Sequence, residues 1–215
     1  MKRVRILLAD DHSLILQGIR RLLETEYDVA GWLTNGREIV DAAARLNPDV
    51  VVLDVSMPIL NGIDAGREIK KANPATKLVF LSMHANAIYL RKALEAGASA
   101  YVLKSGASEE LLEAIEAARR GDTYVSPGFG RDVIESIRHS PRVPTRAVLD
   151  LTGRQRQILQ LIAEGKQNKE IAEILCVSIK TIEFHRSRLM AKLGAHTVVE
   201  LTRFAIQEGL TGSME

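Results

Sequence analysis

Carboxylates, a hydroxyl and an amine recur at equivalent places in the first half of the chain, each directly after an apolar run that is typical of a buried strand. These residues are Asp10, Asp11, Asp54, Ser82 and Lys104. The run 50–53 before Asp54 is rich in β-branched residues and suits a strand buried on both faces. Because open α/β sheets bind ligands at the carboxyl ends of their strands, we expect these side chains to share one crevice.

Three carboxylates that converge without basic partners repel one another, unless a hard cation lies among them. Mg²⁺ prefers oxygen ligands and keeps part of its water shell, so one or two carboxylates and a phosphoryl oxygen complete its coordination. Lys104 adds a compact positive charge that suits a phosphoryl oxygen, and Ser82 adds a hydroxyl. The set predicts an aspartate nucleophile that accepts a phosphoryl group with the help of Mg²⁺.

Each of these residues also has an ordinary structural role when it is considered alone. Asp54 could begin a turn, Lys104 could be a solvated lysine at a strand end, and Ser82 could cap a helix or a turn. Their joint occurrence at matching strand ends favours the chemical role.

Apolar strands and amphipathic helices alternate through residues 1–120. Strands are predicted over residues 3–9, 27–33, 50–54, 77–81 and 100–103, and helices over 14–23, 36–46, 63–72, 87–96 and 108–120, the last with Ser108 as its N-cap. Five strand–helix units in series predict an α/β fold with a doubly wound, five-stranded parallel sheet, because each crossover is long enough to be right-handed.

The pattern changes after residue 121, and we expect a linker over residues 122–149. It contains a turn at Ser126-Pro127-Gly128, a short helix near 131–137, and the stretch HSPRVPTRAV, which has two prolines and no apolar period. The predicted domains are therefore residues 1–121 and residues 150–215.

The composition is that of an ordinary globular protein, with 46% apolar and 26% charged residues in 215. The single cysteine, Cys176, cannot form an internal disulfide, and we expect it, like Trp32, in a core. No apolar run approaches the roughly 18 residues of a membrane span, and acidic residues follow the start too soon for a secretory signal. We expect a soluble, cytoplasmic protein without a membrane partner.

Basic residues are concentrated toward the end of the chain. Residues 1–138 hold 18 basic and 19 acidic residues, whereas residues 139–215 hold 11 basic and 8 acidic ones. Four helices are predicted there, beginning at Thr152 and then over 168–175, 179–193 and 198–207, with the helix-turn-helix spacing between the second and third. The third carries most of the charge: Lys180, Arg186, Arg188 and Lys192 against the single acid Glu183. This all-α domain could bind a phosphate backbone, or the helix could be an ordinary solvated one.

Residues 1 to about 121 resemble the receiver domain of two-component response regulators, whose sheet has the order 2-1-3-4-5. The motif residues are the acidic pair Asp10-Asp11, the phosphoacceptor Asp54, Pro58 four residues later, Ser82 and Lys104. The resemblance implies that Asp11, Asp54 and the backbone carbonyl of Ser56 bind Mg²⁺, with Asp10 acting through water. Tyr101 matches the switch aromatic of the family, although a core residue of the last strand would have the same pattern.

Residues 151–208 resemble the LuxR-type helix-turn-helix of the NarL/FixJ regulators, through LTGRQRQIL, GKQNKEIA, SIKTIEFH and KLGAHTVVEL. Gln155 stands where a glutamate is usual, which should weaken one polar contact. The resemblance places Glu183, Phe184 and Ser187 toward the major groove and Lys180, Thr181, Arg186 and Lys192 near phosphates, and Arg188 is a further DNA-binding candidate through its charge. It makes Val198, Leu201 and Thr202 of the last helix candidates for a dimer contact, with ordinary core packing as the alternative.

The leading hypothesis is a DNA-binding transcription regulator that a sensor histidine kinase phosphorylates on Asp54, which releases the basic domain and favours homodimers on paired half-sites. A Mg²⁺-dependent phosphohydrolase is less favoured, because Ser56 stands where such enzymes of the haloacid dehalogenase type carry a second aspartate. Only slow self-dephosphorylation is expected. A constitutive DNA-binding protein whose receiver never uses phosphate is the third possibility.

Overall fold

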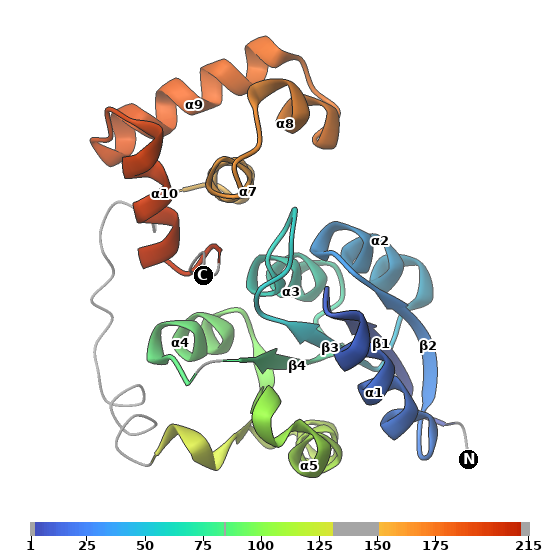
Figure 1. Ribbon diagram of the computed structural model, residues 1–215. Coiled ribbons are helices and arrows are strands. Elements are labelled where there is room, and N and C mark those ends of the chain that lie inside the picture. The colour runs from blue at the N-terminus through green and yellow to red at the C-terminus, as the bar shows by residue number, and fades with distance from the viewer. Residues whose placement is uncertain (1–2, 84, 131–150, 212–215) are drawn as a thin grey trace. The chain divides into compact units, whose positions relative to one another are not determined.

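The computed structural model describes residues 3–83, 85–130 and 151–211, which fall into two compact units, one within residues 1–139 and one within 140–215 (Figure 1). The short helix predicted near 131–137 lies outside the described residues. None of the helices in the described part of the chain is long and apolar enough to cross a membrane.

The first unit is built on a parallel sheet with the strand order 2-1-3-4-5-6. Its strands are β1 (Arg5–Ala9), β2 (Asp28–Leu33), β3 (Val50–Asp54), β4 (Lys77–Ser82), β5 (Ala98–Leu103) and β6 (Tyr124–Val125). The predicted doubly wound sheet and its order 2-1-3-4-5 are confirmed. The count of five strands was wrong by β6, because a strand of two residues is too short to show a periodic pattern.

Helices cover both faces of the sheet (Figure 1). One face carries α1 (Ser13–Glu24) and α5 (Ala107–Arg120), and the other carries α2 (Gly36–Leu46), α3 (Gly62–Ala72) and α4 (Ala87–Glu95). Strand residues alternate between the two cores: Leu7 and Val51 pack toward α2 and α3, whereas Leu8 and Val52 pack toward α1 and α5.

Every residue of β3 is buried, because β3 lies between β1 and β4 and is covered on both faces. Burial of each Val or Leu side chain contributes roughly 1.5–3 kcal/mol to folding. This packing fixes the position of Asp54 at the end of the strand.

Three local predictions were wrong. A single 3₁₀ turn over Lys104–Gly106 precedes α5, so Gly106 and not Ser108 occupies the N-cap position. Trp32 lies on the edge strand β2, 47% exposed, with the Arg20 guanidinium 3.7 Å from its ring centroid. Cys176 is exposed and has a φ of 51° in the turn after α8.

The second unit is all-helical, as predicted. Its helices are α7 (Gly153–Ala163), α8 (Asn168–Ile174), α9 (Ile179–Leu193) and α10 (Val198–Gln207), and they enclose a core that includes Ile158, Ile182, Leu189 and Leu201. A capping box begins α7, in which the Thr152 hydroxyl accepts from the Gln155 amide at 3.2 Å and the Gln155 side-chain oxygen accepts from the Thr152 amide at 3.0 Å. Gln155 therefore supplies a reciprocal polar contact at this helix start.

Gly62 should tolerate no side chain, because a Cβ there would lie 1.9 Å from the Asp54 carbonyl oxygen. We expect Gly62→Ala to lower the free energy of unfolding by about 1–3 kcal/mol, the usual cost of overpacking. Urea unfolding followed by the fluorescence of Trp32, the single tryptophan, measures this.

Gly18 within α1 is the matched control, since a Cβ there meets nothing within 4 Å. Gly18→Ala should raise the stability by roughly 0.5–1 kcal/mol, because alanine is the better helix former. Equal effects of the two substitutions would contradict the close approach at Gly62.

Candidate functional site

The carboxyl ends of four strands bring the predicted site residues of the first unit to one edge of the sheet. Asp10 follows β1, Asp54 and Ser82 end β3 and β4, and Lys104 follows β5. Asp10 and Asp54 are each 1% exposed, and the Lys104 side chain is 3% exposed. The parallel register places these residues at similar heights along neighbouring strands, because Leu53 pairs with Phe80 and Ser82 pairs with Leu103. The expected convergence is present.

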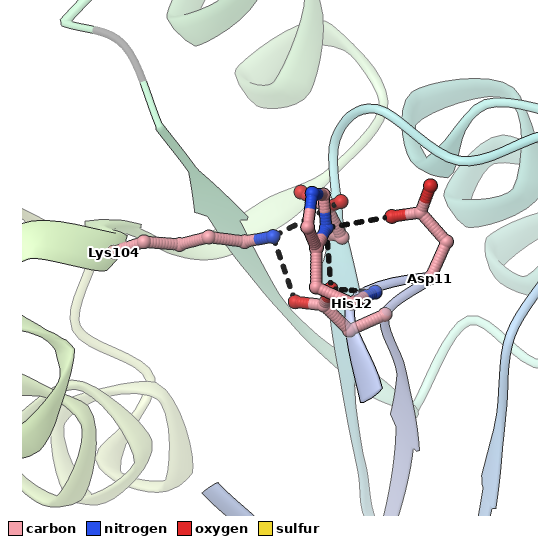
Figure 2. A network of polar contacts seen from close by, with 5 residues as sticks. Asp11, His12 and Lys104 are labelled. Carbon is pink, nitrogen blue, oxygen red and sulfur yellow. Dashed lines mark hydrogen bonds and ion pairs between the residues drawn. The ribbon is translucent and has the colours of Figure 1, made fainter. Parts of the chain in front are cut away.

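An amine bridges the two buried carboxylates. Lys104 Nζ lies 2.7 Å from Asp10 Oδ2 and 3.1 Å from Asp54 Oδ2. Figure 2 shows Lys104 and Asp11 approaching the cluster from opposite sides, with His12 between them. One amine for three carboxylates leaves the cluster negative, and Asp11, on the rim, is the more exposed of the acidic pair.

His12 is the member of this cluster that sequence reasoning missed. Its Nδ1 lies 2.9 Å from Asp11 Oδ1 and 3.1 Å from Asp10 Oδ1, and its backbone amide donates to Asp10 Oδ1 at 2.9 Å. The only signal in the sequence was its position directly after the acidic pair, where the loop turns into α1.

Burial raises the pKa of Asp54 from 3.8 to about 7, because the ionised carboxylate is withdrawn from water. The Lys104 charge opposes this rise, whereas the nearby Asp10 and Asp11 carboxylates add to it. A further positive charge beside Asp54 would therefore stabilise its ionised form at neutral pH.

The donor set fits a hard divalent cation. Ligand atoms of Asp10, Asp11, His12 and Asp54 all lie within 4.8 Å of one another, and three of the four are carboxylate oxygens. Ser56 is exposed in the loop after β3, and its carbonyl remains a predicted ligand. This loop turns tightly: Ile59 has a φ of 71°, and the Leu60 amide donates to the Pro58 carbonyl at 2.8 Å.

Tyr101 points inward and is fully buried. Its ring packs edge to face against Phe129, with 5.3 Å between the centroids and 83° between the planes. Burial raises the pKa of Tyr101, and a hydrogen bond with the Ser82 side chain acts against this rise. Tyr101 is thus a core residue whose hydroxyl meets the site, which is compatible with both roles considered from the sequence.

In the second unit, α9 presents a continuous exposed face. Its members are Lys180, Glu183, Phe184, Ser187, Arg188 and Lys192. Phe184 is 55% exposed, and the Arg188 guanidinium lies 5.2 Å from its ring centroid. An exposed aromatic ring among basic side chains is an arrangement that can meet nucleic acid bases and phosphates.

Two of the side chains predicted to contact phosphates also form hydrogen bonds within the second unit. The Thr181 hydroxyl lies 2.8 Å from the Ser178 hydroxyl, which also accepts from the Thr181 amide at 3.1 Å. Arg186 Nη1 donates to Asn168 Oδ1 at 3.2 Å and so joins α9 to the start of α8. Both side chains are partly buried, and their phosphate contacts remain predictions.

The predicted dimer residues of α10 lie at i, i+3 and i+4 along one side of the helix, but they differ in exposure. Leu201 is 0% exposed and belongs to the core, Val198 is 39% exposed, and Thr202 donates its hydroxyl to the Val198 carbonyl at 3.0 Å. Val199, which the sequence analysis did not select, is 67% exposed. Residues at i and i+2 of a helix point to nearly opposite sides. Val199 is therefore exposed, whereas Leu201 is buried.

Both parts of the chain match known families. Residues 6–116 match the response regulator receiver domain, and residues 149–205 match the bacterial regulatory proteins of the luxR family. The transcriptional regulatory protein MctR of Rhizobium johnstonii is 36% identical over 99% of this chain and 97% of its own length. The oxygen regulatory protein NreC of Staphylococcus carnosus is 33% identical over 96% and 99%.

Solved structures agree with these matches. The RcsB response regulator of Salmonella typhimurium, described for its conformational dynamism in DNA interaction, has a TM-score of 0.62 and 28% identity over 97% of this chain and 99% of that one. A complex of the two-component response regulator RcsB with DNA has a TM-score of 0.59 and 28% identity over 96% and 99%.

The raised pKa of Asp54 predicts a pH dependence of stability. The folded protein holds this proton up to about pH 7, whereas the unfolded chain loses it near 3.8, so stability should fall as the pH rises between these values in the absence of divalent cations. Asp54→Asn should remove this slope and be more stable than the wild type at pH 7.5 by roughly 1–3 kcal/mol.

Denaturant unfolding at several pH values, followed by Trp32 fluorescence, measures this difference. Asp41→Asn on α2, where the carboxylate is exposed, is the control and should keep the wild-type slope. Parallel pH profiles for Asp54→Asn and the wild type would refute the assignment to Asp54.

Proposed function

The chain belongs to the two-component response regulators that join a receiver domain to a LuxR-type DNA-binding domain, and from that premise we propose that phosphorylation of Asp54 controls how tightly it binds DNA. The observation that carries the proposal is the meeting of Asp54, Lys104 and Ser82 at one sheet edge. Nucleophile, cation and hydroxyl donor come from three different strands, which a purely structural cluster would not require.

The chemistry is a phosphoryl transfer to the Asp54 carboxylate. A carboxylate oxygen forms a bond to the phosphorus of a phosphohistidine in a sensor kinase or of a small phosphodonor, the bond from phosphorus to the donor breaks, and the leaving group takes up a proton. The Lys104 amine, 3.1 Å from Asp54, is placed to pair with an oxygen of the transferred group. The Ser82 hydroxyl, at the end of the adjacent strand, is placed to donate to another.

Asp10, Asp11 and Asp54 would hold Mg²⁺, with the Ser56 carbonyl as a further oxygen ligand. When bound, the ion supplies positive charge that keeps Asp54 ionised and offsets the charge of the phosphoryl oxygens. His12 lies 2.9 Å from Asp11 Oδ1, and the carboxylate has a second oxygen that a metal could use. Lys104 remains the counter-charge that the chain itself provides.

Binding to DNA is assigned to the exposed face of α9. Glu183 can accept from cytosine N4, Phe184 can contact a thymine methyl group, and Ser187 lies one turn further along the same face. Lys180, Arg188 and Lys192 would pair with phosphates, and so would Thr181 and Arg186 at the edge of this face. The related RcsB structure with DNA supports the assignment by homology.

A homodimer on paired half-sites completes the proposal. The exposed apolar side chains of α10, Val198 and Val199, together with Thr202, are the candidates for the contact, and buried Leu201 supports them from the core. RcsB, a structural relative, is described as two dimers bound to two parallel DNAs. Phosphorylation would favour the dimer and thereby the occupancy of a paired site.

The proposal is tested with Asp54→Ala. The wild type, incubated with acetyl phosphate and Mg²⁺, should become phosphorylated and bind a selected DNA fragment roughly 5–150-fold more tightly, the usual range of coupling between two sites. Asp54→Ala should show neither change, because the nucleophile is absent. Phosphate-affinity electrophoresis and fluorescence anisotropy measure the two quantities.

Asp41→Ala, an exposed carboxylate of α2, is the control and should respond like the wild type. If Asp54→Ala gained DNA affinity as the wild type does, Asp54 would not be the regulatory site. If the wild type became phosphorylated with no change in affinity, constitutive binding would be the better description.

Two substitutions on α9 should have different effects on DNA binding. Glu183→Ala should relax the preference at one base pair, which corresponds to about 1–3 kcal/mol of lost discrimination. Lys180→Ala should weaken all sequences alike and reduce the slope of log affinity against log salt by about 1, whereas Lys180→Arg should restore both. A randomised-site selection and salt titrations measure these effects, and an unchanged preferred sequence in Glu183→Ala would remove its base contact.

A further inference from the structure

After α5 the chain returns to the sheet beside the site, in a segment that the proposed function does not use. We call residues 124–130 the return segment. Its first two residues form β6, in which Tyr124 pairs with Ala100 and Val125 pairs with Tyr101, and the Ser126 amide then donates to the Tyr101 carbonyl at 2.9 Å. In sequence, the return segment follows the matched receiver domain, and from it the chain leads on to α7.

Ser126 joins the return segment to the end of β5 and to α5. It is 0% exposed. Its hydroxyl accepts a hydrogen bond from the Leu103 amide at 2.9 Å and donates one to the Glu110 carboxylate. Tyr124 donates its hydroxyl to the same carboxylate at 3.3 Å. Since Leu103 immediately precedes Lys104, these bonds hold the backbone from which the Lys104 amine extends.

Phe129 packs against Tyr101, the residue of β5 whose hydroxyl meets the site. It is 4% exposed, and its ring packs edge to face against Tyr101. Gly128 packs closely against Leu103, since a Cβ at that position would lie 2.7 Å from Leu103 Cδ1. The return segment therefore contacts β5 at both Tyr101 and Leu103, on either side of Val102.

We propose that the return segment positions Tyr101 and Lys104, and that it carries a change at Asp54 into the chain that leads to the DNA-binding domain. The inference rests on the proposed function, since it needs Asp54 to be phosphorylated. Any shift of Ser82 or Lys104 toward a phosphoryl group changes the space beside Tyr101 and the end of β5. Close-packed side chains and hydrogen-bonded backbone do not deform independently, so Phe129 and Ser126 must follow. They are positioning residues and touch no phosphoryl oxygen themselves.

Hydrogen exchange of the full-length wild type tests the first half of the proposal. With Mg²⁺ and beryllofluoride, a mimic of the phosphoryl group, the exchange rates of the Leu103, Ser126 and Phe129 amides should change at least threefold, because each donates a hydrogen bond at this junction. Unchanged rates at these three amides, with changes at the Asp54 loop in the same sample, would overturn the proposal.

Variants test the second half. Phe129→Leu keeps an apolar side chain but loses the edge-to-face contact, and Ser126→Ala removes the acceptor of the Leu103 amide. Thr123→Ala, at an exposed residue just before the segment, is the matched control. In both segment variants the ratio of DNA affinities with and without beryllofluoride should fall at least threefold, while Asp54 is still phosphorylated by acetyl phosphate. Thr123→Ala should keep the wild-type ratio.

The outcomes separate this inference from the proposed function. A wild type that is not phosphorylated would overturn both. A wild type that responds, with the same ratio in Phe129→Leu and in Ser126→Ala, would overturn the role of the return segment alone. Circular dichroism of each variant reports folding, and Ser126→Ala decides the matter if Phe129→Leu does not fold.

Discussion

The ion pairs of the Lys104 amine with Asp10 and Asp54 are the interaction on which the candidate site of the first unit depends. Two ionised carboxylates that are each 1% exposed need a compensating charge in a protein interior, unless they keep their protons, and here a single amine serves both. Because Asp11 adds a further negative charge at the rim, the compensation is incomplete. Because positive charge is lacking, the cluster favours the binding of a cation. It also favours a group whose oxygens can pair with Lys104.

The sheet creates this condition by geometry. A parallel, doubly wound sheet places all its strand ends at one edge, and the order 2-1-3-4-5-6 puts β3 between β1 and β4. The apolar strands and the helices on both faces then remove water from Asp54, which is the main cause of its raised pKa. The same packing that stabilises the fold therefore sets the chemical state of the site.

In the second unit, the core holds α9 so that the polar face of this helix is exposed. Ile182 and Leu189 anchor α9 in the core, while Lys180, Phe184 and Arg188 remain in solvent. Arg186 joins α9 to α8 through Asn168, and the Ser178 cap fixes the start of the helix. A helix with an exposed aromatic and basic face suits a domain of the luxR family, which residues 149–205 match.

Much of this molecule follows from the sequence alone. The helices α2, α9 and α10 have the predicted bounds, and the convergence of Asp10, Asp54, Ser82 and Lys104 follows from strand ends in a parallel sheet. These features have local or periodic signals, namely an apolar period, a cap, or a polar residue after a strand. A resemblance to known motifs supplied the roles that the residues alone left open.

Only the tertiary structure decided the contacts between residues that no pattern links. It placed His12 against the acidic pair, Phe129 against Tyr101, Leu201 in the core and Trp32 at the surface. The strand β6 has two residues and no period, so its pairing depends on the space beside β5 that other elements leave. Such contacts result from the packing of distant segments, which is why the contacts of the return segment with Tyr101 and Leu103 are visible only in the folded chain.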